Sequence, residues 1–188
     1  MGTRDLVVTE NITLDGVIEA TEGWFGPAGT EDVDQSDIEE AIAEQREAAD
    51  ALLLGRVTFE EMRGFWPLQT DDETGISAYL DAVAKFVVSR TLDEPGWEGT
   101  TVLRGAPAEE VEALKARPGR DIVVTGSMRL VGELVAAGLV DEYRLFVYPV
   151  VVGRGRRLFE GATAVPALRL VETRRFRRGV VLLRYRTD

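Results

Sequence analysis

The sequence predicts a single α/β domain whose central sheet has about eight strands, most of them parallel. Short apolar segments alternate with longer segments in which apolar residues recur at helical spacing, and this alternation is typical of repeated βαβ units. The last two apolar segments follow each other without a helix between them, which predicts an antiparallel hairpin at the carboxyl end. No internal repeat or low-complexity segment divides the 188 residues. We therefore expect residues 1–188 to form one domain, with helices on both faces of the sheet.

The first half of the chain is expected to supply four strands. Residues 4–11 form a short β-rich segment, and Asp15-Gly16 after it predicts a turn. Residues 35–50 carry apolar side chains on one helical stripe and glutamates mostly on the other, which predicts a helix with a solvated acidic face. Further strands are expected at 51–55, 85–90 and 100–103, and further helices at 56–62, 76–83 and 108–116.

The second half begins with a strand at 121–125 that runs directly into a tight turn at Gly126-Ser127. The helix that follows has its apolar residues close to an i, i+3, i+4, i+7 pattern and ends at Gly138. The segment 143–152 is apolar at nearly every position, so we expect a strand that is buried on both faces. The chain closes with strands at 168–176 and 180–187, joined by a turn at 177–179.

Composition excludes several classes of function. The 22 basic and 33 acidic residues give a net charge of −11, which argues against binding to nucleic acid or to an anionic membrane surface. No apolar segment approaches the length of a membrane span, and no signal peptide precedes the first strand, so we expect a cytoplasmic protein. A small anionic ligand stays possible, because local basic residues decide that question.

The sequence contains no cysteine and no histidine. A thiolate nucleophile, a disulfide, a Ser-His-Asp triad and the common zinc sites are therefore excluded, and we expect no metal. Proton chemistry would have to use other side chains or water. This favours reactions in which a cofactor carries the difficult step and the protein supplies position and electrostatics.

Three of the expected strands end in small, hydroxyl-bearing or cationic residues. In an open parallel sheet, ligands bind outside the carboxyl ends of the strands, so these three groups would converge on one polyanion site. A glycine at a strand-to-helix turn also leaves backbone N–H groups free to bind phosphate, although packing alone often explains such a glycine. The alternative role of Arg56 is a surface salt bridge. The three groups are Gly55-Arg56-Val57-Thr58, Ser89-Arg90 and Thr125-Gly126-Ser127.

A glycine-rich loop at 22–29 follows the first strand and carries two aromatic residues, Trp24 and Phe25. Both side chains look exposed in the sequence, and a long loop in this place is often functional. The alternative is a surface loop in which Trp24 covers the edge of the core. The acidic segment 31–37 comes next, and the sequence does not decide whether it lines a site or faces solvent.

These segments together resemble the dihydrofolate reductase fold family, and most closely its branch that contains the reductase domain of bacterial riboflavin biosynthesis. The resemblance spans nearly the whole chain. It is carried by Leu14-Asp15-Gly16, by the Gly-Arg-x-Thr segment at 55–58, by Ser89-Arg90 and Thr125-Gly126-Ser127, and most specifically by residues 138–142 leading to Tyr148-Pro149 and 150–155.

The resemblance implies NADPH as the cofactor. Its 2′-phosphate would lie among guanidinium and hydroxyl donors, which form charge-assisted hydrogen bonds and favour NADPH over NADH. Its pyrophosphate would lie at the start of the helix after Gly126-Ser127. The implied cofactor-binding residues are Asn11, Leu14, Gly16, Val17, Gly55, Arg56, Thr58, Ser89, Arg90, Thr125, Gly126, Ser127 and Met128, and the implied substrate contacts are Trp24, Phe25 and Tyr148. Asp15, the acidic residue nearest the nicotinamide, is the candidate catalytic residue, and its alternative role is to cap its own turn.

The expected activity is hydride transfer from NADPH to a small pterin-like or aminopyrimidine-like substrate. One alternative is a nucleotide-binding module of the same fold without catalysis, and another is a binder of a different anion, such as flavin phosphate. The resemblance also implies a homodimer, with residues 146–152 or the final hairpin as its interface.

Overall fold

The computed structural model describes residues 4–19, 23–25, 33–160 and 167–187. In chain order the elements alternate much as the sequence predicts. They are β1 (Leu6–Thr13), α1 (Ser36–Ala48), β2 (Ala49–Gly55), α2 (Arg56–Phe65), a 3-10 turn η1 (Trp66–Leu68), α3 (Ile76–Ala82), β3 (Ala84–Val88), β4 (Thr100–Leu103), α4 (Pro107–Lys115), β5 (Asp121–Val124), α5 (Met128–Ala136), β6 (Glu142–Tyr148), β7 (Leu168–Arg175) and β8 (Val181–Thr187).

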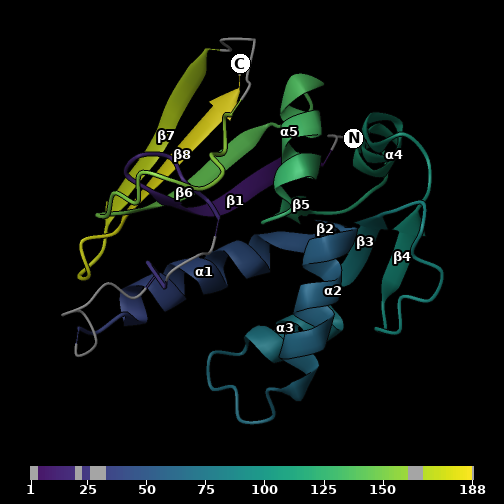
Figure 1. The fold of residues 1–188 in the computed structure, drawn as a ribbon, viewed down its shortest axis with the longest axis horizontal. Coiled ribbons are helices and arrows are strands. Elements are labelled where there is room, and N and C mark those ends of the chain that lie inside the picture. The colour runs from purple at the N-terminus through teal and green to yellow at the C-terminus, as the bar shows by residue number, and fades with distance from the viewer. Residues whose placement is uncertain (1–3, 20–22, 26–32, 161–166, 188) are drawn as a thin grey trace.

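The eight strands form one sheet in the order β4-β3-β2-β5-β1-β6-β8-β7 (Figure 1). The pairs from β4 through to β6 are all parallel. β8 is antiparallel to both β6 and β7. The predicted fold class, a mostly parallel α/β sheet that ends in an antiparallel hairpin, is therefore confirmed.

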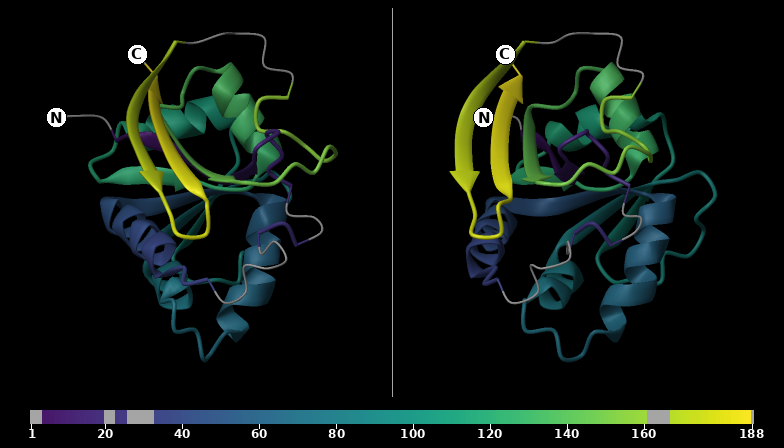
Figure 2. Two further views of the ribbon diagram at one scale, coloured as in Figure 1. Left: turned by 90° about the vertical axis from the view of Figure 1, so that its left-hand side faces the viewer. Right: turned by 60° about the vertical axis from the view of Figure 1, so that its left-hand side comes forward.

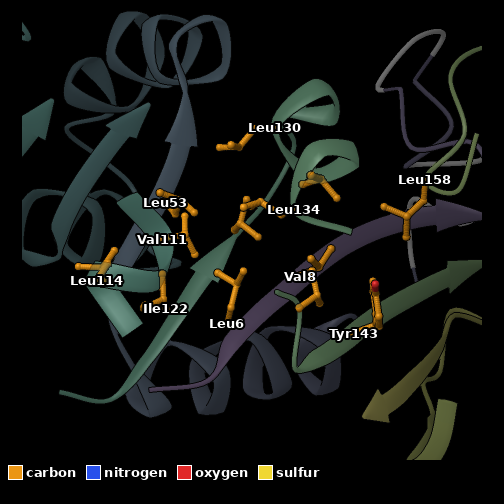
Figure 3. Close-up of a cluster of buried hydrophobic side chains, with 14 of the residues drawn as sticks. Leu6, Val8, Leu53, Val111, Leu114, Ile122, Leu130, Leu134, Tyr143 and Leu158 are labelled. Carbon is orange, nitrogen blue, oxygen red and sulfur yellow. The ribbon is translucent and has the colours of Figure 1, made fainter. Parts of the chain in front are cut away.

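Helices cover both faces of the sheet, as predicted (Figures 1 and 2). On one face, α4 and α5 pack on the largest core cluster, and Figure 3 shows Leu6 and Val8 of β1 in that cluster with Leu134 of α5. On the other face, α2 and α3 bury Phe59 and Leu80, and α1 buries Ile38 over the hairpin end of the sheet. The two faces alternate along each inner strand, because successive side chains point to opposite sides.

The predicted strand boundaries differ from the structure by one or two residues at β2 and β3, and by more at β6. The strand expected at 143–152 is buried as predicted over its first part, but β6 ends at Tyr148. Pro149 has no N–H to donate to a sheet ladder, and Leu14 N–H bonds the Val150 carbonyl 2.9 Å away. Residues 149–158 therefore run as a loop against the segment that follows β1.

The chain changes direction between β1 and β5, which are neighbours in the sheet. From β1 it passes through α1 to β2, on the far side of β5, and from β5 it passes through α5 to β6, on the far side of β1. Because α1 and α5 cover opposite faces, the carboxyl ends of β1 and β5 form the topological switch point of the sheet, the place where ligands bind in open α/β sheets. β5 pairs with β1 only from Leu6 to Val8, whereas β6 pairs with β1 as far as Thr13.

The described part of the acidic segment is bound to the final hairpin. Asp34 forms an ion pair with Arg177, and the Asp37 carboxylate accepts a hydrogen bond of 2.9 Å from the Arg177 N–H. Arg178 donates to the Gln35 side chain. These groups fasten the start of α1 to the β7–β8 turn, whereas Glu31 and Asp32 lie outside the described residues.

The two predicted dimer segments differ in accessibility. In the predicted segment 146–152, Phe146 is buried within the inner strand β6 but Val151 is exposed in the loop after it, while β7 is an edge strand that exposes Leu170 and Val171. Over the described ranges of the chain, none of the helices has the length and apolar character needed to cross a bilayer.

Candidate active site

Two strand-to-helix turns meet at the carboxyl edge of the sheet, where β2 runs into α2 and β5 runs into α5. The Ser127 N–H donates to the Thr58 hydroxyl at 3.0 Å, and the Gly55 N–H donates to the Ser127 hydroxyl at 2.9 Å. Ser127 has a left-handed backbone with φ of 45°, and Gly126 before it has φ of 58°. A Cβ on Gly126 would lie 3.1 Å from the Thr58 methyl group. A glycine is therefore required there both by its φ and by its contact with Thr58.

This arrangement brings the N-termini of α2 and α5 together. Neither helix has a side-chain cap, so backbone N–H groups of both first turns are left for a ligand or solvent. The partial positive charges of two helix ends at one place favour an anion, and phosphate most of all. The predicted residues Gly55, Thr58, Gly126 and Ser127 therefore do lie side by side.

The predicted cationic residues lie beside this cradle. Arg56 opens α2 and pairs with Glu60 at 2.9 Å, in the salt bridge named as its alternative role. Both side chains are well exposed, so the pair stabilises little and can open to a ligand. Arg90 is exposed after β3, while the Ser89 hydroxyl accepts N–H groups of Thr91 and Leu92 and closes its own turn.

Segment 13–19 and the loop 149–158, which carry much of the family resemblance, lie against each other. Asp15 joins them, because its carboxylate accepts hydrogen bonds from the Thr13 hydroxyl at 2.7 Å and from the Gly153 N–H at 2.9 Å. Asn11 and Leu14 are exposed, whereas Val17 is fully buried. The N–H and C=O of Val17 both bond Thr13, so its polar groups are already used.

The environment of Asp15 keeps its carboxyl ionised. The hydrogen bond from Thr13, followed by that from Gly153, lowers its pKa from 3.8 to about 2. A group with this pKa holds no proton to give near neutral pH. The geometry therefore favours the alternative role, in which Asp15 fixes its own turn, and a catalytic role stays a prediction.

The three predicted substrate residues form one aromatic cluster. The rings of Trp24 and Phe25 stack with centroids 4.0 Å apart, and both meet Tyr148 edge to face, at 5.4 Å and 6.0 Å. Trp24 is only 5% exposed, which corrects the expectation that both aromatics are exposed, and its indole N–H bonds the Glu19 carbonyl. Trp24 therefore covers the core, as the alternative interpretation of the loop expects. Phe25 and Tyr148 stay partly exposed beside it.

Glu10 on β1 is a feature that the sequence interpretation missed. It is 4% exposed, and its Oε1 atom has no hydrogen-bond partner in the described part of the chain. Burial raises its pKa from 4.5 to about 8, against the opposing effect of a hydrogen bond from the Gly126 N–H. The sequence did contain a signal for it, because this charged residue falls on the same face of β1 as Leu6, Val8 and Ile12, which are all core residues.

Replacing Thr58 with valine removes the acceptor of the Ser127 N–H without changing the shape of the side chain. We expect the free energy of unfolding to fall by about 1–2 kcal/mol, because a partly buried donor is left unpaired. Urea denaturation measures this difference. The matched control is Thr101→Val on the exposed face of β4. Equal midpoints for the two variants would contradict the bridging role of Thr58.

Replacing Glu10 with glutamine is expected to change how stability depends on pH. The folded-state pKa of Glu10 lies above the ordinary value of 4.5, so between pH 4.5 and about 8 the folded chain holds a proton that the unfolded chain has lost. Wild-type stability is then fully present at low pH and decreases as the pH rises through this window. Glutamine cannot ionise, so the variant escapes a loss on the order of 3 kcal/mol by pH 7.

Urea denaturation of both proteins from pH 5 to pH 8 tests this difference. Glu133→Gln, at an exposed position on α5, is the matched control. Parallel pH profiles for the wild type and Glu10→Gln would show that Glu10 is not held neutral.

Comparison with known proteins agrees with this architecture. The family model of the RibD C-terminal domain matches residues 4–182. The uncharacterized protein YyaP of Bacillus subtilis (strain 168) is 32% identical over 184 residues, which cover 97% of this chain and 94% of that protein.

Two solved structures share the fold at low sequence identity. A protein from Shewanella sp. PV-4, named for riboflavin biosynthesis, superposes with a TM-score of 0.75 at 19% identity, covering 98% of this chain and 99% of its own. Dihydrofolate reductase from Enterococcus faecalis, solved with NADP(H), gives a TM-score of 0.64 at 18% identity, covering 100% and 98%. With a family model that spans nearly all of its length, this chain belongs to the RibD C-terminal domain family.

Proposed function

We propose that this protein is an NADPH-dependent reductase that transfers hydride to a C=N or C=O group of a small pterin-like or aminopyrimidine-like substrate. The observation that carries the proposal is the junction at Ser127, where two uncapped helix N-termini meet beside Arg56. Membership of the RibD C-terminal domain family and the dihydrofolate reductase fold support an oxidoreductase of the pyrimidine or pterin type.

The residues at the junction fit a phosphorylated dinucleotide. Backbone N–H groups at the starts of α2 and α5 would hold the pyrophosphate, with Gly126 allowing close approach. Arg56 and Arg90 would hold the 2′-phosphate, for which Arg56 would exchange its exposed pair with Glu60 for a more highly charged partner. When bound, NADPH supplies the hydride.

The aromatic cluster fits the substrate side of the reaction. Tyr148 packs against the core cluster on the α1 face of the sheet, and Phe25 stands edge to face with it. Partly exposed aromatic rings offer stacking surface to a planar heterocycle. The proton that accompanies hydride transfer would come from water or from a group of the substrate, since Asp15 is ionised.

Titration with NADPH and NADH, followed by the fluorescence of the three tryptophans, tests the cofactor assignment. We expect NADPH to bind at least about tenfold more tightly than NADH, because the 2′-phosphate adds charge-assisted hydrogen bonds. The double variant Arg56→Ala, Arg90→Ala should lose most of this preference and bind NADH almost unchanged. Arg117→Ala, exposed after α4, is the control for loss of positive charge.

Failure of the wild type to bind either nucleotide at high micromolar concentration would reject the reductase. Tight NADPH binding without turnover of any pterin or aminopyrimidine acceptor would instead favour a non-catalytic nucleotide-binding module.

We also propose a homodimer formed through the edge strand β7. Its Leu170 and Val171 are 50% and 42% exposed on an edge strand, which has a free side for pairing, whereas the exposed Val151 of the other predicted segment lies in a loop after the inner strand β6. Light scattering after size exclusion should give twice the chain mass of 20.7 kDa, and Leu170→Lys with Val171→Lys should give the single mass. Leu68→Lys, at the exposed η1 turn, is the control. A monomer mass for the wild type at all concentrations would reject the dimer.

A further inference from the structure

Glu10 lies on β1 just beyond the point where this strand stops pairing with β5. The two strands pair only as far as Val8, and the Glu10 carboxyl, two residues further along β1, is close enough to the Gly126 backbone N–H for this group to oppose the rise in its pKa. The side chain is 4% exposed, yet its Oε1 atom has no partner among the described residues. A buried polar atom without a partner costs free energy, so an atom of a ligand is a natural partner for it.

The side chain lies on the cofactor side of the sheet and not on the substrate side. Glu10 shares the α5 face with Val8 and Ile12, which belong to the core cluster under α5. Tyr148 packs on the opposite face, in the cluster under α1. Glu10 is therefore badly placed to protonate a substrate beside Tyr148, and well placed to meet a ligand that crosses the Gly126 turn.

Charge decreases along the carboxyl edge toward Glu10. In the strand order β3-β2-β5-β1 the edge presents Arg90, then Arg56 with the start of α2, then Gly126 with the start of α5, and finally Glu10. A phosphorylated dinucleotide laid along this edge places its 2′-phosphate at the arginines and its pyrophosphate at the helix ends. Its uncharged nicotinamide end then lies over β1, beside a carboxyl that burial keeps neutral.

Charged groups on the neighbouring elements are engaged elsewhere. Burial raises the pKa of Tyr143, the titratable group that β6 contributes to this face, so it stays neutral. On the neighbouring elements, Arg129 pairs with the solvent-exposed Glu133 on α5, Arg56 with Glu60 on α2, Arg156 with Glu19, and Arg157 with Asp15. The protonation of Glu10 is therefore set by its own burial and by the Gly126 N–H.

We propose that Glu10 is a further cofactor-binding residue, whose buried and otherwise unpartnered Oε1 forms a hydrogen bond with the carboxamide at the nicotinamide end of the bound dinucleotide. The identity of the ligand rests on the proposed function. The role of Glu10 adds to it a contact on β1 and a link between cofactor affinity and pH, because the ionised carboxylate has no proton to donate.

The test compares two probes, NADPH and 2′-phospho-ADP-ribose, which lacks only the nicotinamide. Their affinities are measured by fluorescence or calorimetry at pH 7, 8 and 9, where the 2′-phosphate keeps its charge because its second pKa is near 6. Wild-type affinity for NADPH should fall about tenfold from pH 7 to pH 9, as the Glu10 proton is lost. Affinity for 2′-phospho-ADP-ribose should stay constant.

Two variants complete the experiment. Glu10→Gln keeps a hydrogen-bond donor and cannot ionise, so its NADPH affinity should not depend on pH. Glu10→Ala should bind NADPH about tenfold more weakly than the wild type at pH 7, which corresponds to the loss of one hydrogen bond. Neither variant should change the affinity for 2′-phospho-ADP-ribose. Glu133→Gln serves as the control, and the wild-type pH profile keeps the test decisive if Glu10→Ala does not fold.

The outcomes separate this inference from the proposed function. A flat pH profile for wild-type NADPH binding would overturn the role of Glu10 and leave the reductase standing. The same pH dependence for both probes would also overturn it, since it would show repulsion of phosphate and not recognition of the carboxamide. Absence of NADPH binding at every pH would overturn the proposed function, and this inference with it.

Discussion

The candidate site depends on the two hydrogen bonds of Ser127. Its N–H bonds Thr58 at the start of α2, and its hydroxyl accepts the N–H of Gly55 at the end of β2. The helices α2 and α5 cover opposite faces of the sheet, so packing within either layer cannot hold their first turns together. The left-handed backbone of Ser127 costs about 1–3 kcal/mol, and the two hydrogen bonds offset that cost. The strained backbone of Ser127 thus accompanies two hydrogen bonds that hold the N-termini of α2 and α5 at a fixed distance from each other.

The fold was predictable because its signals are local. Each inner strand is a short apolar segment, each is followed by a turn residue or a helical period, and Gly55 and Gly126 mark two of the strand ends within the segments themselves. Convergence of these ends follows from the parallel arrangement alone. The end of β6 was predicted wrongly although Pro149 is a local signal for it, since proline has no N–H to donate to a sheet ladder. The course of the chain after Pro149 was not predictable, because the hydrogen bond from Leu14 N–H to the Val150 carbonyl joins segments more than a hundred residues apart.

Details of the site that depend on non-local contacts were not predictable. The burial of Trp24 requires Tyr148 beside it, and Tyr148 is distant in the sequence. The alternation of β1 does mark Glu10 as a charged residue on a core face. The role of Glu10 cannot be inferred from that alternation alone. It depends on β5, which lies next to β1 in the sheet although four strands come before it in the chain, and which brings Gly126 near the Glu10 carboxyl. Local sequence patterns therefore predict candidate residues at strand ends and turns. They do not predict residues whose contacts come from segments distant in the sequence.

Glu10 and Asp15 show how one short segment produces two opposite carboxyl groups. Asp15 accepts hydrogen bonds from the Thr13 hydroxyl and from the N–H groups of Gly153 and Val152, and its pKa falls to about 2. Glu10 is enclosed by apolar side chains with a single opposing N–H, and its pKa rises to about 8. Burial decides the upward pKa shift of Glu10, whereas hydrogen-bond donors decide the downward pKa shift of Asp15. The ionised Asp15 carboxylate joins segment 13–19 to the loop 149–158 through its hydrogen bonds. The neutral Glu10 carboxyl, in contrast, has a proton that it can donate in a hydrogen bond. The division of roles between them therefore follows from their surroundings and not from their side-chain chemistry.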